Sequence, residues 1–464
     1  MSSNALKKEK KAIQLNSIVI VFVLSVVVAL LTHVVPAGEF AREVVDGREL
    51  VVPGSFQFID SNPISFWEYW TSIPAAWTNG AGNIWMILVV SAMMAVLEAT
   101  GALDAFLNKA LSGRMKGKEE LMVILIGTFF SILGSTGTFL TPIIAVVPVG
   151  VKAAKKMGYD GVVGFMLTYA STAVGFNAGI MNIYSTAIGQ SIAGLPEFSG
   201  AGGRVIEHIV FLAITMFATL QYGRRVKADP SKSFIPGHVR EDVGESTETV
   251  KLSVRQILVG IVTLLGFGLV IFNCLVNGWS NTEITAMFFL MSVAIGIIGG
   301  LGANKTAQTF GKGIQGTATI AVIIGMSQLV SLLMSNANIL DTVVYYASMP
   351  IEFLGPYLGT IALFIFNLCF NFFIPGSTSH AYVVMPIQMG IADLTGIKPQ
   401  VAIEAFKLGE SLTNMIWPTV PTFMACLALL NIPYNKWLKW AFKWVVLGCG
   451  GAGIAIMMIW QLVG

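Results

Sequence analysis

The segment from 121 to 151 reads LMVILIGTFFSILGSTGTFLTPIIAVVPVGV and carries the pattern on which the fold depends. Two apolar arms flank the polar, glycine-containing stretch Gly134-Ser135-Thr136-Gly137-Thr138. Each arm has roughly 13 residues, so as a helix it reaches only about 20 Å, less than the ~30 Å hydrocarbon core of a bilayer. The pattern predicts a re-entrant hairpin, which enters the membrane and returns to the same face.

Basic residues lie at both ends of this segment. Short cytoplasmic loops of membrane proteins collect Lys and Arg, so both ends are expected on the cytoplasmic side. The residues concerned are Lys109, Arg114, Lys116 and Lys118 before the segment, and Lys152, Lys155 and Lys156 after it.

A second segment, 357 to 392, has the same construction around Pro375-Gly376-Ser377-Thr378-Ser379-His380. No Lys or Arg lies between 313 and 397. The charge rule therefore predicts a second hairpin, which enters from the outside.

The composition supports a membrane protein throughout the chain. Of the 464 residues, 55% are hydrophobic and 11% are charged, and the mean hydropathy is +0.75. Soluble domains carry about 25% charged residues, so a soluble enzyme is excluded. A net charge of +3 indicates no nucleic-acid partner. The four cysteines fall in apolar stretches without Cys-x-x-Cys spacing, which indicates neither a disulfide framework nor a zinc site.

Nine crossings accompany the two hairpins in the predicted topology. The first follows a lysine cluster but is too long for a signal peptide, so we expect a retained helix with a cytoplasmic amino terminus. Two runs, 162–192 and 400–430, are too long for one straight crossing and are predicted to be broken helices. This topology leaves all but five of the 28 basic residues inside, the five being Arg42, Arg48, Arg204, Lys398 and Lys407. The seven straight crossings, the first one included, are expected near 18–35, 82–99, 205–222, 257–276, 284–301, 314–334 and 438–462.

The order of elements repeats, with a hairpin followed by a broken helix in each half. Because one additional crossing separates the halves, the second copy has the opposite orientation. The predicted fold is an all-α, polytopic, inverted-repeat protein, and interrupted helices in such repeats form the midplane site of many secondary transporters. The predicted parts are a first repeat at 1–223, a cytoplasmic linker at 224–256, a connecting helix at 257–282 and a second repeat at 283–464.

The hairpin tips are the main candidate binding elements. Their hydroxyls, freed backbone groups and helix amino termini would suit a small polar ligand with a carboxylate. The alternative is that the hydroxyls bond their own backbone and the glycines serve close packing. The candidates are Gly134, Ser135, Thr136, Gly137 and Thr138 in the first tip, and Gly376, Ser377, Thr378, Ser379 and His380 in the second.

The breaks in the two long helices supply further candidates. Backbone without helical bonds survives at membrane depth only where it lines a cavity or is buried in protein. We expect Asn177 and Asn414 to meet the tips, although a proline kink with asparagines bonding neighbouring helices is an alternative. The candidates are Gly175, Asn177 and Asn182 in the first break, and Ser411, Thr413 and Asn414 in the second.

Glu410 is the acidic residue directly before the second break. An ionisable group inside a membrane segment defaults to a functional role, here as a site for Na⁺, a proton or a substrate ammonium. If the break began earlier, Glu410 would instead lie in an interfacial aqueous layer. His380 could relay a proton or cap a helix.

The run Gly409-Glu410-Ser411-Leu412-Thr413-Asn414-Met415-Ile416-Trp417-Pro418-Thr419, continued by 431–437 (NIPYNKW), resembles the four-carbon dicarboxylate anaerobic carrier family of the DcuC and YfcC type. The resemblance covers nearly the whole chain. It implies a multi-pass protein of the bacterial inner membrane, a homodimer, and an elevator-type transport domain moving against a scaffold. It also implies coupling to Na⁺ or H⁺, with sodium near Ser135, Asn177, Ser377 and Asn414.

These observations predict a secondary active transporter, by ion-coupled symport or exchange, for a small carboxylate such as a four-carbon dicarboxylate or an amino acid. No enzyme activity and no cofactor are expected. One alternative is a basic amino acid antiporter, because the subgroup resembled is associated with arginine and ornithine. An ion channel is the alternative from another class.

Overall fold

The computed structural model describes residues 17–45, 48–111, 117–137, 139–140, 142–196, 198–235, 252–277 and 279–463. Thr138, one of the predicted tip residues, lies outside these described residues, as do Arg114, Lys116 and the amino-terminal lysines. The described chain is mostly helical, as the sequence predicts.

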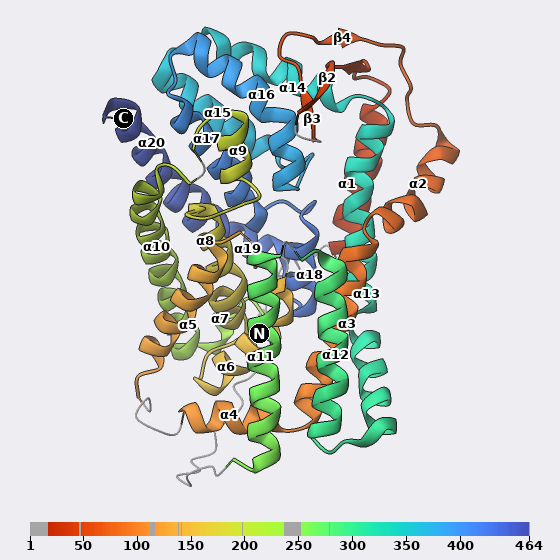
Figure 1. The fold of residues 1–464 in the computed structure, drawn as a ribbon, viewed down its shortest axis with the longest axis vertical. Helices are drawn as coiled ribbons and strands as arrows, with labels where there is room; N and C mark the ends of the chain where they lie inside the picture. The colour runs from red at the N-terminus through yellow and green to blue at the C-terminus, as the bar shows by residue number, and fades with distance from the viewer. Residues whose placement is uncertain are drawn as a thin grey trace, which may run out of the picture.

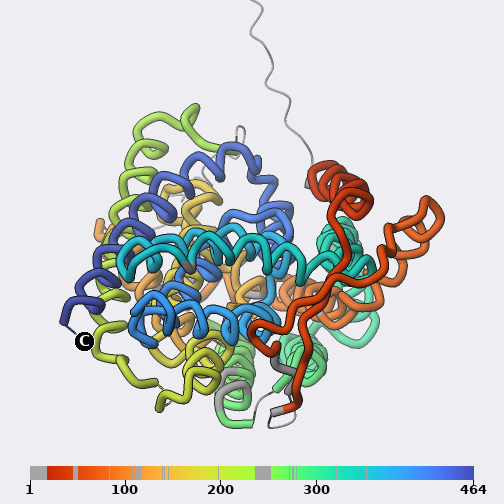
Figure 2. The backbone as a smooth tube through the Cα atoms, turned by 90° about the horizontal axis from the view of Figure 1, so that it is seen from above, coloured from red at the N-terminus to blue at the C-terminus, as the bar shows by residue number. Residues whose placement is uncertain are grey.

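The helices form two groups that lie side by side in both views (Figures 1 and 2). The group on the right of Figure 1 is built around the long helix α13 (Gly302–Asn336), which packs against α3 (Ala81–Ala99). Its other members are α1 (Ser17–Leu31), α2 (Phe66–Asn79) and α12 (Asn281–Ile298). Helix α11 (Val254–Val276) lies in the middle of Figure 1 and packs against α12.

The group on the left contains both predicted hairpins and both predicted breaks. From the first half it contains α5 (Glu119–Gly134), α6 (Val147–Lys156), α7 (Gly161–Phe165), α8 (Ser171–Ala178), α9 (Thr186–Ile192) and α10 (Ala201–Ala228). From the second half it contains α15 (Pro356–Phe370), α16 (Ser377–Thr395), α17 (Pro399–Leu412), α18 (Pro421–Leu429), α19 (Tyr434–Ala441) and α20 (Gly451–Val463). Two short helices, α4 (Ala102–Leu111) and α14 (Leu340–Ser348), precede the hairpins.

Local sequence explains where the two long segments break. Helix α8 ends at Ala178 and is capped by Gly179, whose φ of 58° is the left-handed conformation that glycine adopts without strain. Helix α17 passes into the single turn Thr413–Met415, and Pro421 begins α18. A proline cannot supply the backbone N–H that a continuous helix would need, but it is well tolerated in the first turn.

Four short strands correct the all-α expectation. Strand β1 (Gly38–Glu39) pairs with β4 (Gln57–Phe58), and β2 (Arg42–Val45) pairs with β3 (Arg48–Val51), both antiparallel. This small region lies at the upper end of the molecule in Figure 1. The sequence pattern missed it because paired stretches this short carry little periodic signal.

Within the described residues, three helices are long and apolar enough to cross a membrane, or up to five if two bent pairs each count as one span. The three are Ala201–Ala228, Asn281–Ile298 and Tyr434–Val463. The bent pairs are Phe66–Asn79 with Ile84–Ala99, and Gly302–Thr319 with Ala321–Asn336. Shorter apolar helices at Ile18–Leu31, Val254–Val270 and Pro356–Phe370 coincide with further predicted spans or hairpin arms.

Candidate functional site

Residues of both predicted hairpin tips line one cavity of about 490 Å³. Gly137 contributes from the first tip, whereas Gly376, Ser377, Thr378 and Ser379 contribute from the second. The other lining residues are Leu140, Pro142, Tyr169, Phe176, Tyr184, Trp279, Ser280, Asn281, Ile284, Gln328, Ser331, Ile374, Pro375, Asn414, Val420, Pro421 and Thr422.

Two helices begin at the wall of this cavity. The Pro375-Gly376 turn is followed by α16 at Ser377, and α18 starts at Pro421. The first N–H groups of a helix lack intrahelical partners and carry partial positive charge. The cavity therefore has two places that suit a carboxylate oxygen.

Glu410 is fully buried and does not line the cavity itself, but it contacts two residues that do. Its Oε1 accepts hydrogen bonds from Ser377 Oγ at 2.5 Å and from Asn414 Nδ2 at 3.1 Å. Its other oxygen, Oε2, is buried without a partner in the described part of the chain. Burial excludes the aqueous interfacial layer from this conformation, and the carboxylate reaches the cavity through two lining side chains.

Asn371 stabilises the carboxyl-terminal end of α17 by hydrogen bonds. Its amide nitrogen donates to the Glu410 carbonyl oxygen (2.9 Å), to Thr413 Oγ1 (2.9 Å) and to Asn414 Oδ1 (3.1 Å). The Tyr169 hydroxyl donates to the Asn414 carbonyl oxygen at 2.9 Å. These bonds satisfy backbone and side-chain groups where the helix stops, so the break is held by specific partners.

Asn177 joins the two broken helices. Its side-chain amide lies 2.8 Å from the carbonyl oxygens of Ala173 and Ser411, so the nitrogen faces both and donates. Asn182 forms the turn after α8, where its Oδ1 accepts from the backbone N–H groups of Tyr184 and Ser185 at 2.9 and 3.2 Å. Neither asparagine lines the cavity, whereas Asn414 does.

The first tip is packed more tightly than the second. The hydroxyls of Ser135 and Thr136 donate to carbonyl oxygens of their own helix, at 2.7 and 2.8 Å. A Cβ on Gly134 would lie 2.0 Å from the Thr172 carbonyl oxygen, and one on Gly175 would lie 1.8 Å from the Ser131 carbonyl oxygen. The hydroxyls and glycines here match the close-packing alternative, and Gly137 is the described residue of this tip that lines the cavity.

His380 does not point into the cavity. Its ring is fully buried, lies 3.1 Å from Asn367 Oδ1 through Nε2, and packs edge-on against Phe370 and Phe406. Its side chain therefore bonds another side chain and caps no helix end. Asn367 also donates to Gln388 Oε1 at 2.8 Å, which extends the same contact to the middle of α16.

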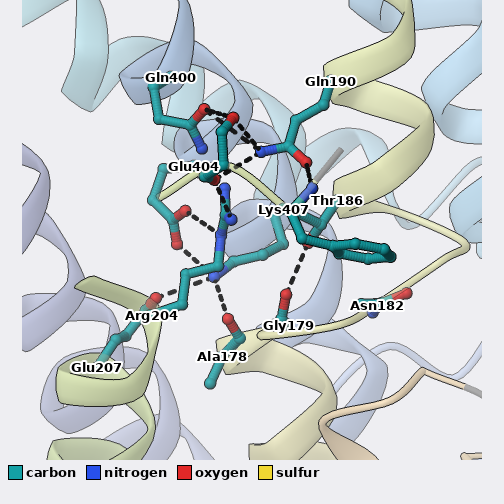
Figure 3. A network of polar contacts seen from close by, with 12 residues as sticks. Ala178, Gly179, Asn182, Thr186, Gln190, Arg204, Glu207, Gln400, Glu404 and Lys407 are labelled. Atoms are coloured by element: carbon teal, nitrogen blue, oxygen red, sulfur yellow. Dashed lines mark hydrogen bonds and ion pairs between the residues drawn. The ribbon is translucent and has the colours of Figure 1, made fainter. Parts of the chain in front are cut away.

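The sequence analysis did not predict a buried network of ion pairs (Figure 3). Lys407 was expected outside, near the membrane surface, but it is fully buried and bridges Glu207 Oε2 at 2.9 Å and Glu404 Oε1. Arg204, also expected outside, is fully buried and pairs with Glu404 Oε2 at 3.2 Å. These two placements correct the expected charge distribution.

A sequence signal for this network exists. Arg204 and Glu207 are three residues apart in one apolar helix, and Glu404 and Lys407 are three residues apart in another. Side chains at this spacing share a helix face, so opposite charges can pair there and compensate one another where water is excluded. Among the described residues, no group of three or more His, Cys, Asp or Glu side chains could hold a metal ion.

Apolar helices of spanning length, two broken helices and an uncharged cavity between them define a helical membrane protein with a site for a small ligand. The sequence model of the C4-dicarboxylate anaerobic carrier family, DcuC, matches residues 15–461. The chain belongs to this family, which confirms the family expected from the sequence and makes the protein a member of a transporter family.

Two curated relatives cover most of the chain. The "Putative basic amino acid antiporter YfcC" of Escherichia coli (strain K12) is 27% identical over 465 residues, covering 91% of this chain and 92% of the relative. An uncharacterized protein of Haemophilus influenzae (strain ATCC 51907 / DSM 11121 / KW20 / Rd) is 24% identical over 412 residues, covering 87% and 79%.

Solved structures with a more distant likeness include two transport proteins. The YdaH transporter of Alcanivorax borkumensis aligns with a TM-score of 0.43 at 13% identity, over 96% of this chain and 99% of that one. MtrF of Neisseria gonorrhoeae, described with a class of antimetabolite efflux pumps, aligns with a TM-score of 0.43 at 14% identity, over 97% and 96%.

Proposed function

We propose that this protein is a secondary active transporter for an amino acid, with a basic amino acid as the preferred substrate. The observation that carries the proposal is the Glu410 carboxylate behind the cavity wall. Ser377 and Asn414 both donate to it, at 2.5 and 3.1 Å, and both line the cavity. Because their protons point at Glu410, the Ser377 hydroxyl oxygen is left as an acceptor for a substrate ammonium.

The electrostatics of the cavity support a cationic group. Its described lining contains no Lys, Arg, His, Asp or Glu, and two carboxylates lie directly behind it: the buried Glu410 accepts from Ser377, and Glu283 accepts from Ser280. In a low-dielectric site a charge one layer away acts strongly. Three of the lining aromatics, Tyr169, Tyr184 and Trp279, have ring faces that attract cations.

The amino terminus of α18 completes the recognition of an amino acid in this proposal. It is suited to the α-carboxylate, at the wall where Pro421 begins the helix, because the ammonium is assigned to Ser377 at the start of α16. An amino acid would then be bound at both ends, by acceptors at its ammonium and by a helix dipole at its carboxylate. The name of the Escherichia coli relative, a putative basic amino acid antiporter, agrees with a basic amino acid.

A four-carbon dicarboxylate is the second candidate, because the family description names that substrate. Its two carboxylates would have only hydroxyls and the two helix amino termini to bind them in the described lining. The negative charge of Glu410 would oppose a dianion unless Glu410 were protonated. Binding of a dicarboxylate therefore requires Glu410 to be protonated, whereas binding of an amino acid does not.

The proposed transport cycle is alternating access by an elevator movement within a homodimer of the bacterial inner membrane. The helix group that contains α5–α10 and α15–α20 would move against the group around α13. In support of a re-entrant first hairpin, both of its ends lie beside the end of α10: Glu119 Oε2 is 3.8 Å from Lys227 Nζ, and that ammonium lies 5.2 Å from the Tyr159 ring. Symport with a proton and exchange of substrates are both compatible with this cycle.

Counterflow in proteoliposomes tests the proposal. Vesicles loaded with unlabelled arginine should accumulate labelled arginine, whereas empty vesicles should not, because exchange requires an occupied site on each side. Succinate loaded in place of arginine should support at least about tenfold less arginine uptake, equivalent to about 1.4 kcal/mol of discrimination.

Two further measurements complete the design. Counterflow is repeated with labelled succinate, and arginine counterflow is repeated with the variant Ser377→Ala. The variant Thr71→Ala, at an exposed position, is the matched control. Ser377→Ala removes the acceptor at the cavity wall and should reduce arginine counterflow, whereas Thr71→Ala should leave it unchanged. Succinate counterflow without arginine counterflow would replace the proposal by the dicarboxylate alternative. Flux of labelled arginine that does not depend on loading would indicate a channel.

A further inference from the structure

The ammonium of Lys407 lies at the end of the first broken helix. It donates to the Ala178 carbonyl oxygen at 2.7 Å, and Ala178 is the last residue of α8. The same Nζ contacts Glu207 Oε2 at 2.9 Å and Glu404 Oε1. Figure 3 shows the side chain crossing from α17 to reach α8 and α10.

This position has the chemistry of a coupling-ion site. The carboxyl-terminal end of a half-helix carries partial negative charge, and in many secondary transporters such ends and unwound carbonyl groups coordinate Na⁺. Here one helix-end carbonyl and two carboxylates converge. A sodium ion does not fit at this point, because the Lys407 ammonium already contacts all three oxygen donors.

We propose that Lys407 is a tethered cation that takes the place of a coupling Na⁺ at the end of α8. The network is charge-balanced: two carboxylates, Glu207 and Glu404, face the two cations Lys407 and Arg204, and all four side chains are fully buried. Burying an unbalanced charge is costly, so a free monovalent cation could bind only if the lysine charge were removed.

This inference rests on the proposed transport function. It limits which ion can be coupled to transport. With the cation supplied by the chain itself, Na⁺ does not drive transport through this position. In this conformation the end of α8 is held to α17, because Lys407 belongs to the second broken helix and Ala178 to the first.

The test removes the tethered charge and asks whether a free ion replaces it. Lys407→Met keeps much of the volume and leaves the three oxygens without a cation. In detergent and without substrate, the variant should unfold at lower temperature than the parent in choline chloride, and NaCl should raise its Tm by roughly 3 °C or more. The parent, Lys407→Arg and the exposed-lysine control Lys443→Met should show no such difference between the two salts.

One further variant makes the result decisive. Glu207→Gln combined with Lys407→Met restores the charge balance, so it should fold without any response to NaCl, but with no cation at Ala178 its arginine counterflow should be lost. Lys407→Met that shows the same Tm in choline, sodium and methylammonium chlorides would overturn the proposal. If Lys407→Met is not recovered folded, parental counterflow by the double variant would overturn it.

The thermal measurement needs no substrate, so it separates this proposal from the transport assignment. A sodium response of Lys407→Met supports the tethered cation even if arginine is not the substrate. Conversely, arginine counterflow by the parent supports the transport assignment even if the sodium response is absent.

Discussion

Glu410 combines full burial with incomplete hydrogen bonding. One oxygen accepts from Ser377 and Asn414, and the other has no partner among the described residues. An ionised carboxylate in such surroundings is costly unless a cation, a proton or additional donors compensate it. In the proposed function, an ammonium at the adjacent wall would supply the missing compensation.

Replacing Glu410 with Gln tests this role. The amide keeps the shape and can accept from Ser377, but the negative charge is lost, so gradient-driven arginine accumulation should fall at least about tenfold. A hydrogen bond to a charged group contributes about 1.5–3 kcal/mol, enough for an effect of that size. Accumulation is measured in proteoliposomes over a range of pH and Na⁺ concentration.

Glu43→Gln is the matched control, because Glu43 lies exposed in the short strand β2. It should accumulate substrate at the parental rate. Parental accumulation by Glu410→Gln at every pH and Na⁺ concentration would mean that the buried carboxylate is structural only. Loss of pH dependence with retained binding would instead identify Glu410 as the proton carrier.

At the scale of elements, the first tip depends on close contact between α5 and α8. Glycines on both helices allow their backbones to meet, at Gly134 against Thr172 and at Gly175 against Ser131. Larger residues would separate the helices and displace Ser135, whose carbonyl oxygen accepts from the Met181 N–H at 3.1 Å. The glycines therefore position the tip relative to the break.

Gly175→Ala should disturb this contact. The added Cβ would lie 1.8 Å from the Ser131 carbonyl oxygen and 2.8 Å from the Ser135 nitrogen, both rigid backbone atoms. Overpacking of this kind costs about 1–3 kcal/mol or more, so we expect a lower Tm and reduced counterflow. Thermal unfolding in detergent measures the Tm, and exchange in proteoliposomes measures the counterflow.

The comparison is Gly316→Ala in α13, where nothing lies within 4 Å of the added methyl group. Alanine in a helix interior is favoured over glycine by about 0.5–1 kcal/mol, so this variant should be as stable as the parent or slightly more so. Equal Tm values for the two variants would show that α5 and α8 can separate without cost.

The two groups of helices in the molecule do not follow the order of the helices in the sequence. Helices of both halves share each group, since α17 packs with α8 and α15 while α13 packs with α2 and α3 (Figure 1). Each group therefore contains helices from both sides of the predicted boundaries at 223 and 283, and the division into two repeats stays a prediction. A movement of one group would carry both tips together.

Topology is the prediction at this scale. Single cysteines at Lys118 and Lys155, in a background without Cys274, Cys369, Cys426 and Cys449, should both react with an impermeant maleimide from the cytoplasmic face. The reason is that the intervening segment is too short to cross twice and its two ends lie beside the same end of α10. Labelling is compared in intact cells and in inverted vesicles.

A cysteine at Asp393, after the second hairpin, is the control for the opposite face and should react in intact cells. Reaction of Lys118 and Lys155 variants from opposite faces would show that 121–151 crosses the membrane. The inverted-repeat assignment would then be wrong, whatever the substrate.

The sequence by itself determined the mostly helical, apolar chain and the breaks near Gly179 and Pro421, whereas the re-entrant course of the two hairpins stays a prediction. These features follow from local causes: apolar runs of limited length, and glycine or proline where a helix cannot continue. The family was also predictable, because the 409–419 run is contiguous in the chain.

Only the tertiary structure decided which polar groups meet. Ser377 faces Glu410 whereas Ser135 bonds its own helix, although both are tip serines. Lys407 and Arg204 lie deep among helices and not at the surface, because each finds an acidic partner about 200 positions away. Sequence periodicity records which residues share a helix face, but a charge can be buried only when a distant opposite charge compensates it, and that pairing exists only after the helices have packed.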